Sequence, residues 1–86
     1  MKNRNLYLEA VQNIPDEVKR ETRLTFAIAD KIASLLHQKN LSQKDLALKM
    51  GKSEAEVSVW LSGQHNFTLR TLAKLSSALG TDIVAV

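Results

Sequence analysis

The sequence has no cysteine, one proline, three glycines and aromatic residues at only 5% of its 86 positions. Without cysteine the chain can form neither a disulfide framework nor a thiolate metal site, and this fits a reducing compartment. Because aromatic residues are scarce, aliphatic side chains must build the core. A chain of this length buries one modest core and is too short for a catalytic cleft supported by a scaffold.

Long apolar runs are also absent. No stretch approaches the length that spans a membrane, and the N-terminus, MKNRNLYLEA, lacks the apolar segment of a signal peptide. We therefore expect a cytoplasmic protein. Neither His37 nor His65 has a second metal ligand at suitable spacing, and no acidic pair or Ser/His/Asp grouping suggests catalysis. The sequence predicts no enzyme activity, no cofactor and no metal site.

Residues 41–63, LSQKDLALKMGKSEAEVSVWLSG, predict two short helices joined by a tight turn. Ser42 is the expected N-cap of the first helix and Ser53 that of the second. Glu56 is expected to complete a proper capping box with Ser53, whereas Asp45 is an imperfect partner for Ser42 because the box prefers Glu or Gln.

Glycines and apolar spacing complete this helix-turn-helix pattern. Gly51 and Gly63 follow the two helices, where a left-handed backbone costs a glycine little. Apolar residues recur at helical spacing in both helices: Leu46, Ala47 and Met50 in the first, and Val57, Trp60 and Leu61 in the second. A small Ala47 facing Val57 permits a close crossing. A helix-turn-helix is a DNA-binding structure; the alternative is an ordinary pair of core helices.

Together with residues 64–80, this stretch resembles the Cro and phage-repressor (XRE-like) helix-turn-helix family, and within it HigA-type antitoxins most. The resemblance covers residues 25–80. It is carried by Gln43, the Leu46-Ala47 pair, Gly51, Val57, WLSG at 60–63 and HNFTLRTLA at 65–73. It implies a DNA-binding repressor, and an antitoxin of this kind also neutralises a toxin protein and represses their shared operon.

The flanking sequence predicts further helices, giving a small all-α domain of four to five helices. Residues 6–11 suit one or two helical turns, and residues 16–39 suit a long helix that Asn40 ends. Its apolar stripe is Phe26, Ala29, Ile32, Ala33 and Leu36. Thr68 is the expected cap of a last helix, which Gly80 ends. That helix carries Leu69, Leu72, Ala73, Leu75 and Leu79.

The last six residues, TDIVAV, are β-prone, and a short C-terminal strand is a possible addition to the all-α fold. One hypothesis is that residues 82–86 pair with their copy in a two-fold dimer. The alternatives are that the strand folds back onto its own domain, or that the sequence stops inside a longer protein. We therefore expect an N-terminal helical extension (1–24), a helix-turn-helix DNA-binding domain (25–80) and a strand-like tail (81–86).

The second helix of the motif should lie in the major groove with its outward side chains on the bases. The predicted base-reading residues are Ser53, Glu54, Ala55, Ser58 and Val59. None is the Arg, Gln or Asn that makes bidentate contacts to guanine or adenine. Apolar groups suit thymine methyls, which predicts T-rich positions and modest discrimination. Alternatively, a neighbouring protomer covers Val59.

Phosphate contacts are expected to position the protein. Six residues are predicted to make them: Gln43, Lys44, Lys52, Asn66, Thr68 and Arg70. The net charge is +3 overall, and residues 40–74 carry five basic residues against three acids. One copy should therefore bind weakly and in a salt-dependent way.

These patterns predict a dimeric, sequence-specific repressor of transcription whose partners are double-stranded DNA and, if it is an antitoxin, a toxin protein. Two copies of the motif would meet half-sites about 34 Å apart. The alternative is an interaction module that uses the helix-turn-helix fold for protein contacts and does not read DNA.

Overall fold

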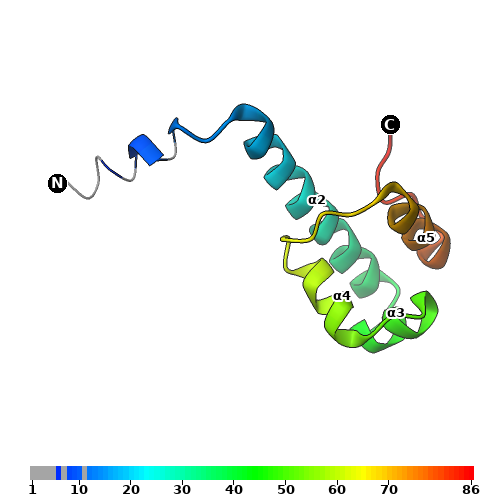
Figure 1. Cartoon of the computed structure of the whole chain (residues 1–86). Helices are drawn as coiled ribbons and strands as arrows, with labels where there is room; N and C mark the ends of the chain where they lie inside the picture. Colours follow the sequence, from blue (N-terminus) through cyan, green and yellow to red (C-terminus); the bar gives the residue numbers. More distant parts are fainter. Residues whose placement is uncertain (1–5, 7, 11) are drawn as a thin grey trace.

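The computed structural model describes residues 6, 8–10 and 12–86. Figure 1 shows helices joined by short loops, with no β-strand among the described residues. Helix α2 spans Asp16–Gln38, α3 Gln43–Met50, α4 Glu54–Leu61 and α5 Leu69–Leu79. The all-α prediction is confirmed.

The predicted N-terminal turns are only partly visible. Leu6, residues 8–10 and Gln12 are helical, whereas positions 7 and 11 of those turns and residues 1–5 of the predicted extension lie outside the described residues. None of the helices in the described part of the chain has both the length and the apolar character needed to cross a bilayer.

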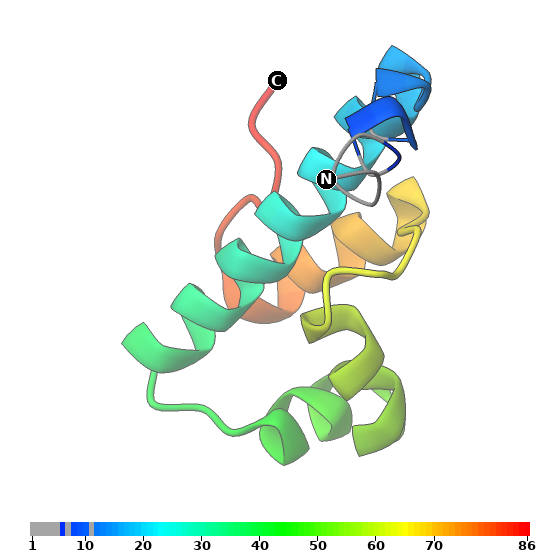
Figure 2. The ribbon, with the colours of Figure 1, turned by 90° about the vertical axis from the view of Figure 1, so that its left-hand side faces the viewer.

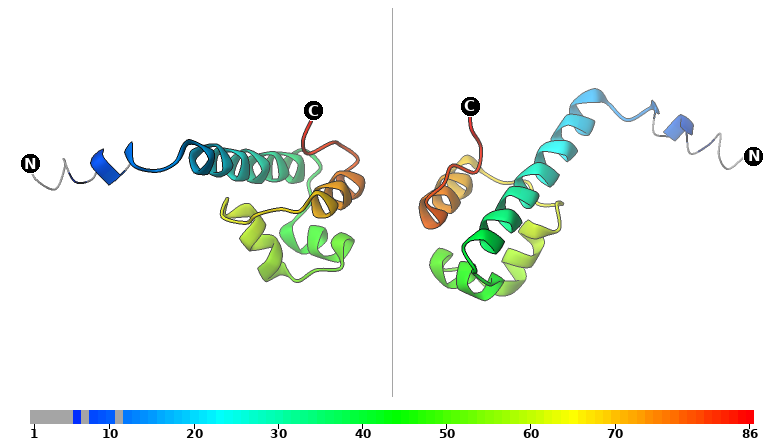
Figure 3. Two further views of the ribbon diagram at one scale, coloured as in Figure 1. Left: turned by 45° about the horizontal axis from the view of Figure 1, so that its top comes forward. Right: turned by 180° about the vertical axis from the view of Figure 1, so that it is seen from behind.

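Helix α2 is one uninterrupted element that projects beyond the other helices at its N-terminal end (Figure 3). It contains no glycine or proline, and Asp16 and Glu17 occupy its first turn, where the helix dipole favours acids. Asp16 and Arg20 form an exposed ion pair at 2.7 Å, a contact worth little in water. The helix ends as predicted, with Asn40 in a left-handed conformation at φ 55°.

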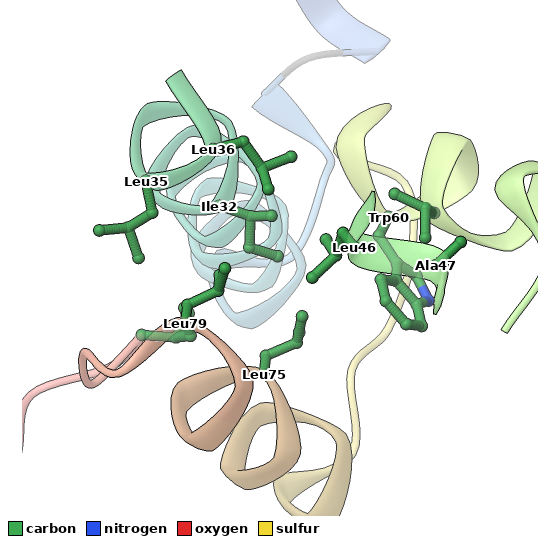
Figure 4. Close-up of a cluster of buried hydrophobic side chains, with 10 residues drawn as sticks. Ile32, Leu35, Leu36, Leu46, Ala47, Trp60, Leu75 and Leu79 are labelled. Atoms are coloured by element: carbon green, nitrogen blue, oxygen red, sulfur yellow. The ribbon is translucent and has the colours of Figure 1, made fainter. Parts of the chain in front are cut away.

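The predicted stripe on α2 needs two corrections. Ala29, Ile32 and Leu36 are buried, but Phe26 is 48% exposed, and Ala33 is exposed with Leu35 buried in its place. The reason is tertiary: α5 and the C-terminal tail cover the Leu35 side of the helix, where Leu79 lies beside it (Figure 4).

The core is aliphatic apart from the one tryptophan, Trp60, as the scarcity of aromatic residues predicts. It joins side chains from all four helices and the tail: Ile32, Leu35, Leu36, Leu46, Ala47, Val57, Trp60, Leu75, Leu79 and Ile83. Figure 2 shows α2 crossing in front of α5, with α3 and α4 below. Two predicted apolar positions of α5 are not in this core, because Leu69 and Ala73 fall to one side of the buried face.

The C-terminal tail folds back onto its own domain rather than forming a strand. Gly80 adopts a left-handed conformation at φ 66°, which reverses the chain after α5. Ile83 is 6% exposed and enters the core, and its N–H donates to Ser76 Oγ at 3.0 Å. The possible strand is not formed in this chain, because a serine on α5, and not a neighbouring strand, satisfies this backbone group. The tail instead follows the alternative in which it folds back onto its own domain. Val84 and Val86 remain exposed.

Candidate nucleic-acid interface

The first helix of the motif, α3, begins with a complete capping box. The Ser42 side chain accepts the N–H of Asp45 at 3.0 Å, and the Asp45 carboxylate accepts the N–H of Ser42 at 2.8 Å. The hydrogen bond from the Ser42 backbone N–H, and after it the Ser42 side chain, hold the pKa of the Asp45 carboxyl below its usual value, with Lys49 and Lys44 contributing through charge. Sequence reasoning underrated this cap.

The second helix, α4, has only half of its expected box. Ser53 Oγ accepts the N–H of Glu56 at 3.1 Å, but the reciprocal bond from the Ser53 N–H to the Glu56 carboxylate does not form. The prediction that Glu56 makes the proper box was therefore wrong. The Glu56 side chain instead lines a surface hollow beside Lys52.

The turn between these helices matches the prediction. Gly51 is left-handed at φ 65°, and the following Lys52 N–H donates to the carbonyl oxygen of Ala47 at 2.9 Å. Ala47 and Val57 are buried in the same cluster, at 4% and 0% exposure. The small residue thus lies where the two helices pack, which fixes α4 against α3.

The outer side of α4 is open to solvent. All five predicted base-reading residues are exposed: Ser53, Glu54, Ala55, Ser58 and Val59. Val59 is half exposed in this chain, so its own domain does not cover it. Ser62 lies farther along, where its hydroxyl donates to the Val59 carbonyl oxygen at 2.6 Å and closes the helix end.

The six predicted phosphate contacts are also exposed, but they fall into separate groups. Lys52, Asn66 and Thr68 line one hollow between α4 and the start of α5. Gln43 and Lys44 lie in the first turn of α3, and the remaining residue, Arg70, lies in the first turn of α5. The interface therefore has one outward helix face flanked by two helix starts.

Comparison with known families decides what this arrangement is. A family model described as helix-turn-helix matches residues 32–86, which is more than half of the chain. The chain belongs to the helix-turn-helix family. The match supports the Cro and repressor type and makes the protein a DNA-binding helix-turn-helix regulator. Neither the curated proteins nor the solved structures gave a match.

In a helix-turn-helix protein the second helix of the motif, here α4, is called the recognition helix. The loop between this helix and α5 is held by aromatic packing. The His65 and Phe67 rings meet edge to face, with centroids 4.7 Å apart, and the Trp60 ring lies 6.3 Å from His65 and 6.2 Å from Phe67. Sequence reasoning treated His65 only as a poor metal ligand. The pattern His-Asn-Phe places residues 65 and 67 on one side of an extended segment, and this alternation could have revealed the pair.

Thr68 ends this loop as the N-cap of α5. Its Oγ1 accepts the N–H of Thr71 at 3.1 Å and shares a hydrogen bond with Thr71 Oγ1 at 3.0 Å. The predicted cap is confirmed. The first turn of α5 is thereby fixed next to the hollow that Lys52 and Asn66 line.

The C-terminal end of the recognition helix of this helix-turn-helix protein rests on α2. Gly63 is buried and left-handed at φ 82°, and a Cβ built on it would lie 2.3 Å from Cδ1 of Phe26. Only a glycine leaves room for the ring there. This contact ties α4 to the helix that projects from the domain.

Proposed function

We propose that this protein is a sequence-specific transcriptional repressor that binds DNA as a dimer, with α4 in the major groove. One observation carries the proposal: the outer side of α4 is exposed to solvent, while its inner side is fixed by the buried Val57 and Trp60. A recognition helix needs this combination of a rigid position and an uncovered face.

The residues proposed to read bases are Ser53, Glu54, Ala55, Ser58 and Val59. Their exposure supports the assignment. Because Ala55 and Val59 offer only apolar surface, we expect contacts with thymine methyl groups and modest discrimination. Selection of binders from random DNA tests this, and a preference for guanine opposite Val59 would contradict it.

The residues proposed to contact phosphates are Gln43, Lys44, Lys52, Asn66, Thr68 and Arg70. All of them except Lys52, which lies in the turn before α4, are placed at or next to the starts of α3 and α5. This placement supports the role, because helix N-termini present free N–H groups and a partial positive charge to anions. The few cations predict weak binding by one copy. Two copies on half-sites about 34 Å apart would supply the missing affinity.

A gel shift at low salt against the DNA upstream of the gene tests the repressor role, and sedimentation of the free protein and the complex tests the dimer. If the protein binds this DNA as a dimer, and competitor DNA of mixed sequence does not displace it, the result supports both the repressor role and the dimer. Absence of any DNA complex would favour the alternative, an interaction module. The apolar and acidic outer face of α4 is the observation that favours this alternative.

We also propose that the protein is the antitoxin of a toxin–antitoxin pair, on the basis of its resemblance to HigA-type antitoxins. The projecting part of α2 supports a partner contact, because Val18 and Leu24 are 46% and 59% exposed there. Co-expression with the product of the neighbouring gene tests it. We expect a stable complex that Leu24→Glu weakens and the control Lys31→Glu, also on the exposed surface of α2, does not.

A further inference from the structure

The hollow between α4 and α5 contains an ionisable residue that the sequence did not assign to DNA. Its lining includes His65 next to Asn66 and Thr68, two proposed phosphate contacts. Lys52 from the turn before α4 and Glu56 from α4 also line it. The imidazole therefore lies among the groups proposed to meet the DNA backbone.

His65 has a fixed position in this hollow. Its ring packs edge to face on Phe67, with centroids 4.7 Å apart, and beside the buried Trp60. The ring is only partly buried, so one side packs on the domain while the rest faces solvent. Packing of this kind orients a side chain before its ligand arrives, which lowers the entropic cost of binding.

The charges around the hollow nearly cancel when His65 is neutral. Among the described residues that line it, Lys52 is the one permanent cation and Glu56 the one acid, while α5 contributes the uncharged Thr68 and Thr71. The start of α5 adds a partial positive charge. Protonation of His65 would therefore give the hollow a net positive charge from its side chains.

We propose that His65 contacts a DNA phosphate and that its protonation strengthens binding, so that the affinity of this protein for DNA rises as the pH falls below neutrality. This inference rests on the proposed DNA-binding function. Histidine is the side chain whose ordinary titration lies in this pH range. Protonation of His65 would thus make DNA binding depend on pH at a surface that has little net charge from its other side chains.

The direction follows from linkage. A phosphate beside the imidazole stabilises its protonated form, so the complex binds a proton more tightly than the free protein does. DNA binding is then coupled to proton uptake, and affinity must increase as protons become more available.

The experiment measures Kd for a mixed-sequence DNA duplex of about two helical turns, by fluorescence anisotropy at constant ionic strength. We expect the original protein to bind about three- to ten-fold more tightly at about pH 6 than at about pH 8. His65→Phe keeps the aromatic packing but cannot titrate, and His65→Gln keeps a polar group without the ring. Both are expected to lose most of this pH dependence.

His37→Gln is the matched control, because it removes the other of the two histidines in the chain. It should keep the pH dependence. Thermal unfolding of each variant reports whether it folds, and His65→Phe is expected to unfold at close to the original temperature. If the pH dependence of binding persists in folded His65→Phe, or disappears in His37→Gln, the proposed role of His65 is wrong. The proposed DNA-binding function is not contradicted by either result. If no duplex binds at either pH, both the inference and the DNA-binding function fail.

Discussion

The backbone N–H of Ile83 donates to the side-chain oxygen of Ser76, 3.0 Å away. The same hydroxyl donates to the carbonyl oxygen of Leu72 at 2.8 Å, and the N–H of Thr81 donates to the carbonyl oxygen of Ser76 at 3.1 Å. One serine thus links two turns of α5 to the returning tail. These bonds hold Ile83 in the core.

Removing this hydroxyl should destabilise the fold. Ser76→Ala leaves the partly buried Ile83 N–H without its acceptor, and we expect a loss of about 1–2 kcal/mol in the free energy of unfolding. Urea denaturation measures it. Ser77→Ala, at an exposed position next to it, is the control and should stay within about 0.5 kcal/mol of the original protein. Equal effects of the two changes would contradict the structural role of Ser76.

Gly63→Ala should be far more harmful than the same change at another left-handed glycine. The new methyl group would collide with the Phe26 ring, and the positive φ adds strain, so we expect a loss of about 3 kcal/mol or more. Gly51→Ala is the matched control. It meets no atom within 4 Å, so it should cost only the backbone strain of about 1–2 kcal/mol.

A double variant separates the collision from the strain. Phe26→Ala removes the ring that the added methyl group would strike. In urea denaturation, we expect the double variant Gly63→Ala/Phe26→Ala to lose less free energy of unfolding than the two single variants lose in total. The difference should be about 1 kcal/mol or more. Additive losses would show that the ring does not limit the space at Gly63.

The capping box of α3 predicts a pH-dependent contribution to stability. The folded-state pKa of Asp45 is lowered, so the stabilisation is present above the unfolded-state pKa of about 3.9 and is lost as the pH falls through the folded value. Asp45→Ala should be less stable than the original protein at neutral pH, and the difference should shrink in acid. Thermal unfolding across this pH range measures it.

Glu56→Ala provides the comparison, because Glu56 has the equivalent position in α4 without the reciprocal hydrogen bond. Its effect on stability at neutral pH should be the smaller of the two. A larger effect than that of Asp45→Ala would mean that the second cap is the stronger one.

A phosphate contact by Arg70 predicts a change in salt dependence. Arg70→Ala should weaken binding to all DNA sequences and reduce the slope of log K against log salt concentration by about one unit per protomer. Lys74→Ala removes an equally exposed cation of the same helix that we do not place at the DNA. An Arg70→Ala slope equal to that of the original protein would exclude the contact.

The local features of the fold were predictable from the sequence. Caps at Ser42, Ser53 and Thr68 and glycine stops at Gly51 and Gly80 depend on a few neighbouring residues, and all of them occur where expected. The chemistry of such positions is fixed by backbone geometry, which short patterns report directly.

The features that sequence reasoning missed depend on distant partners. The tail is β-prone by composition, yet Ser76 and the core determine how it folds. Glu56 matches the capping-box pattern, but it does not make the reciprocal hydrogen bond and is one of the residues that line the hollow with Lys52 and His65. No local pattern encodes which element will pack against which, so these positions needed the structure.

Because α2 is one continuous helix, the direction in which each side chain of its projecting N-terminal part points is fixed relative to the rest of the domain. The first turns of α2 lie outside the core, while Ile32 and Leu36 are buried near the other end of the same helix. Each residue of an α-helix advances the chain by about 1.5 Å and turns it by about 100°. One residue inserted near Leu24 would therefore rotate the projecting segment by about 100° around the axis, whereas seven inserted residues would nearly restore its phase. For the partner protein that we propose on this segment, helical phase would therefore set its angular position relative to α4, and with it the side of the bound DNA on which the partner lies.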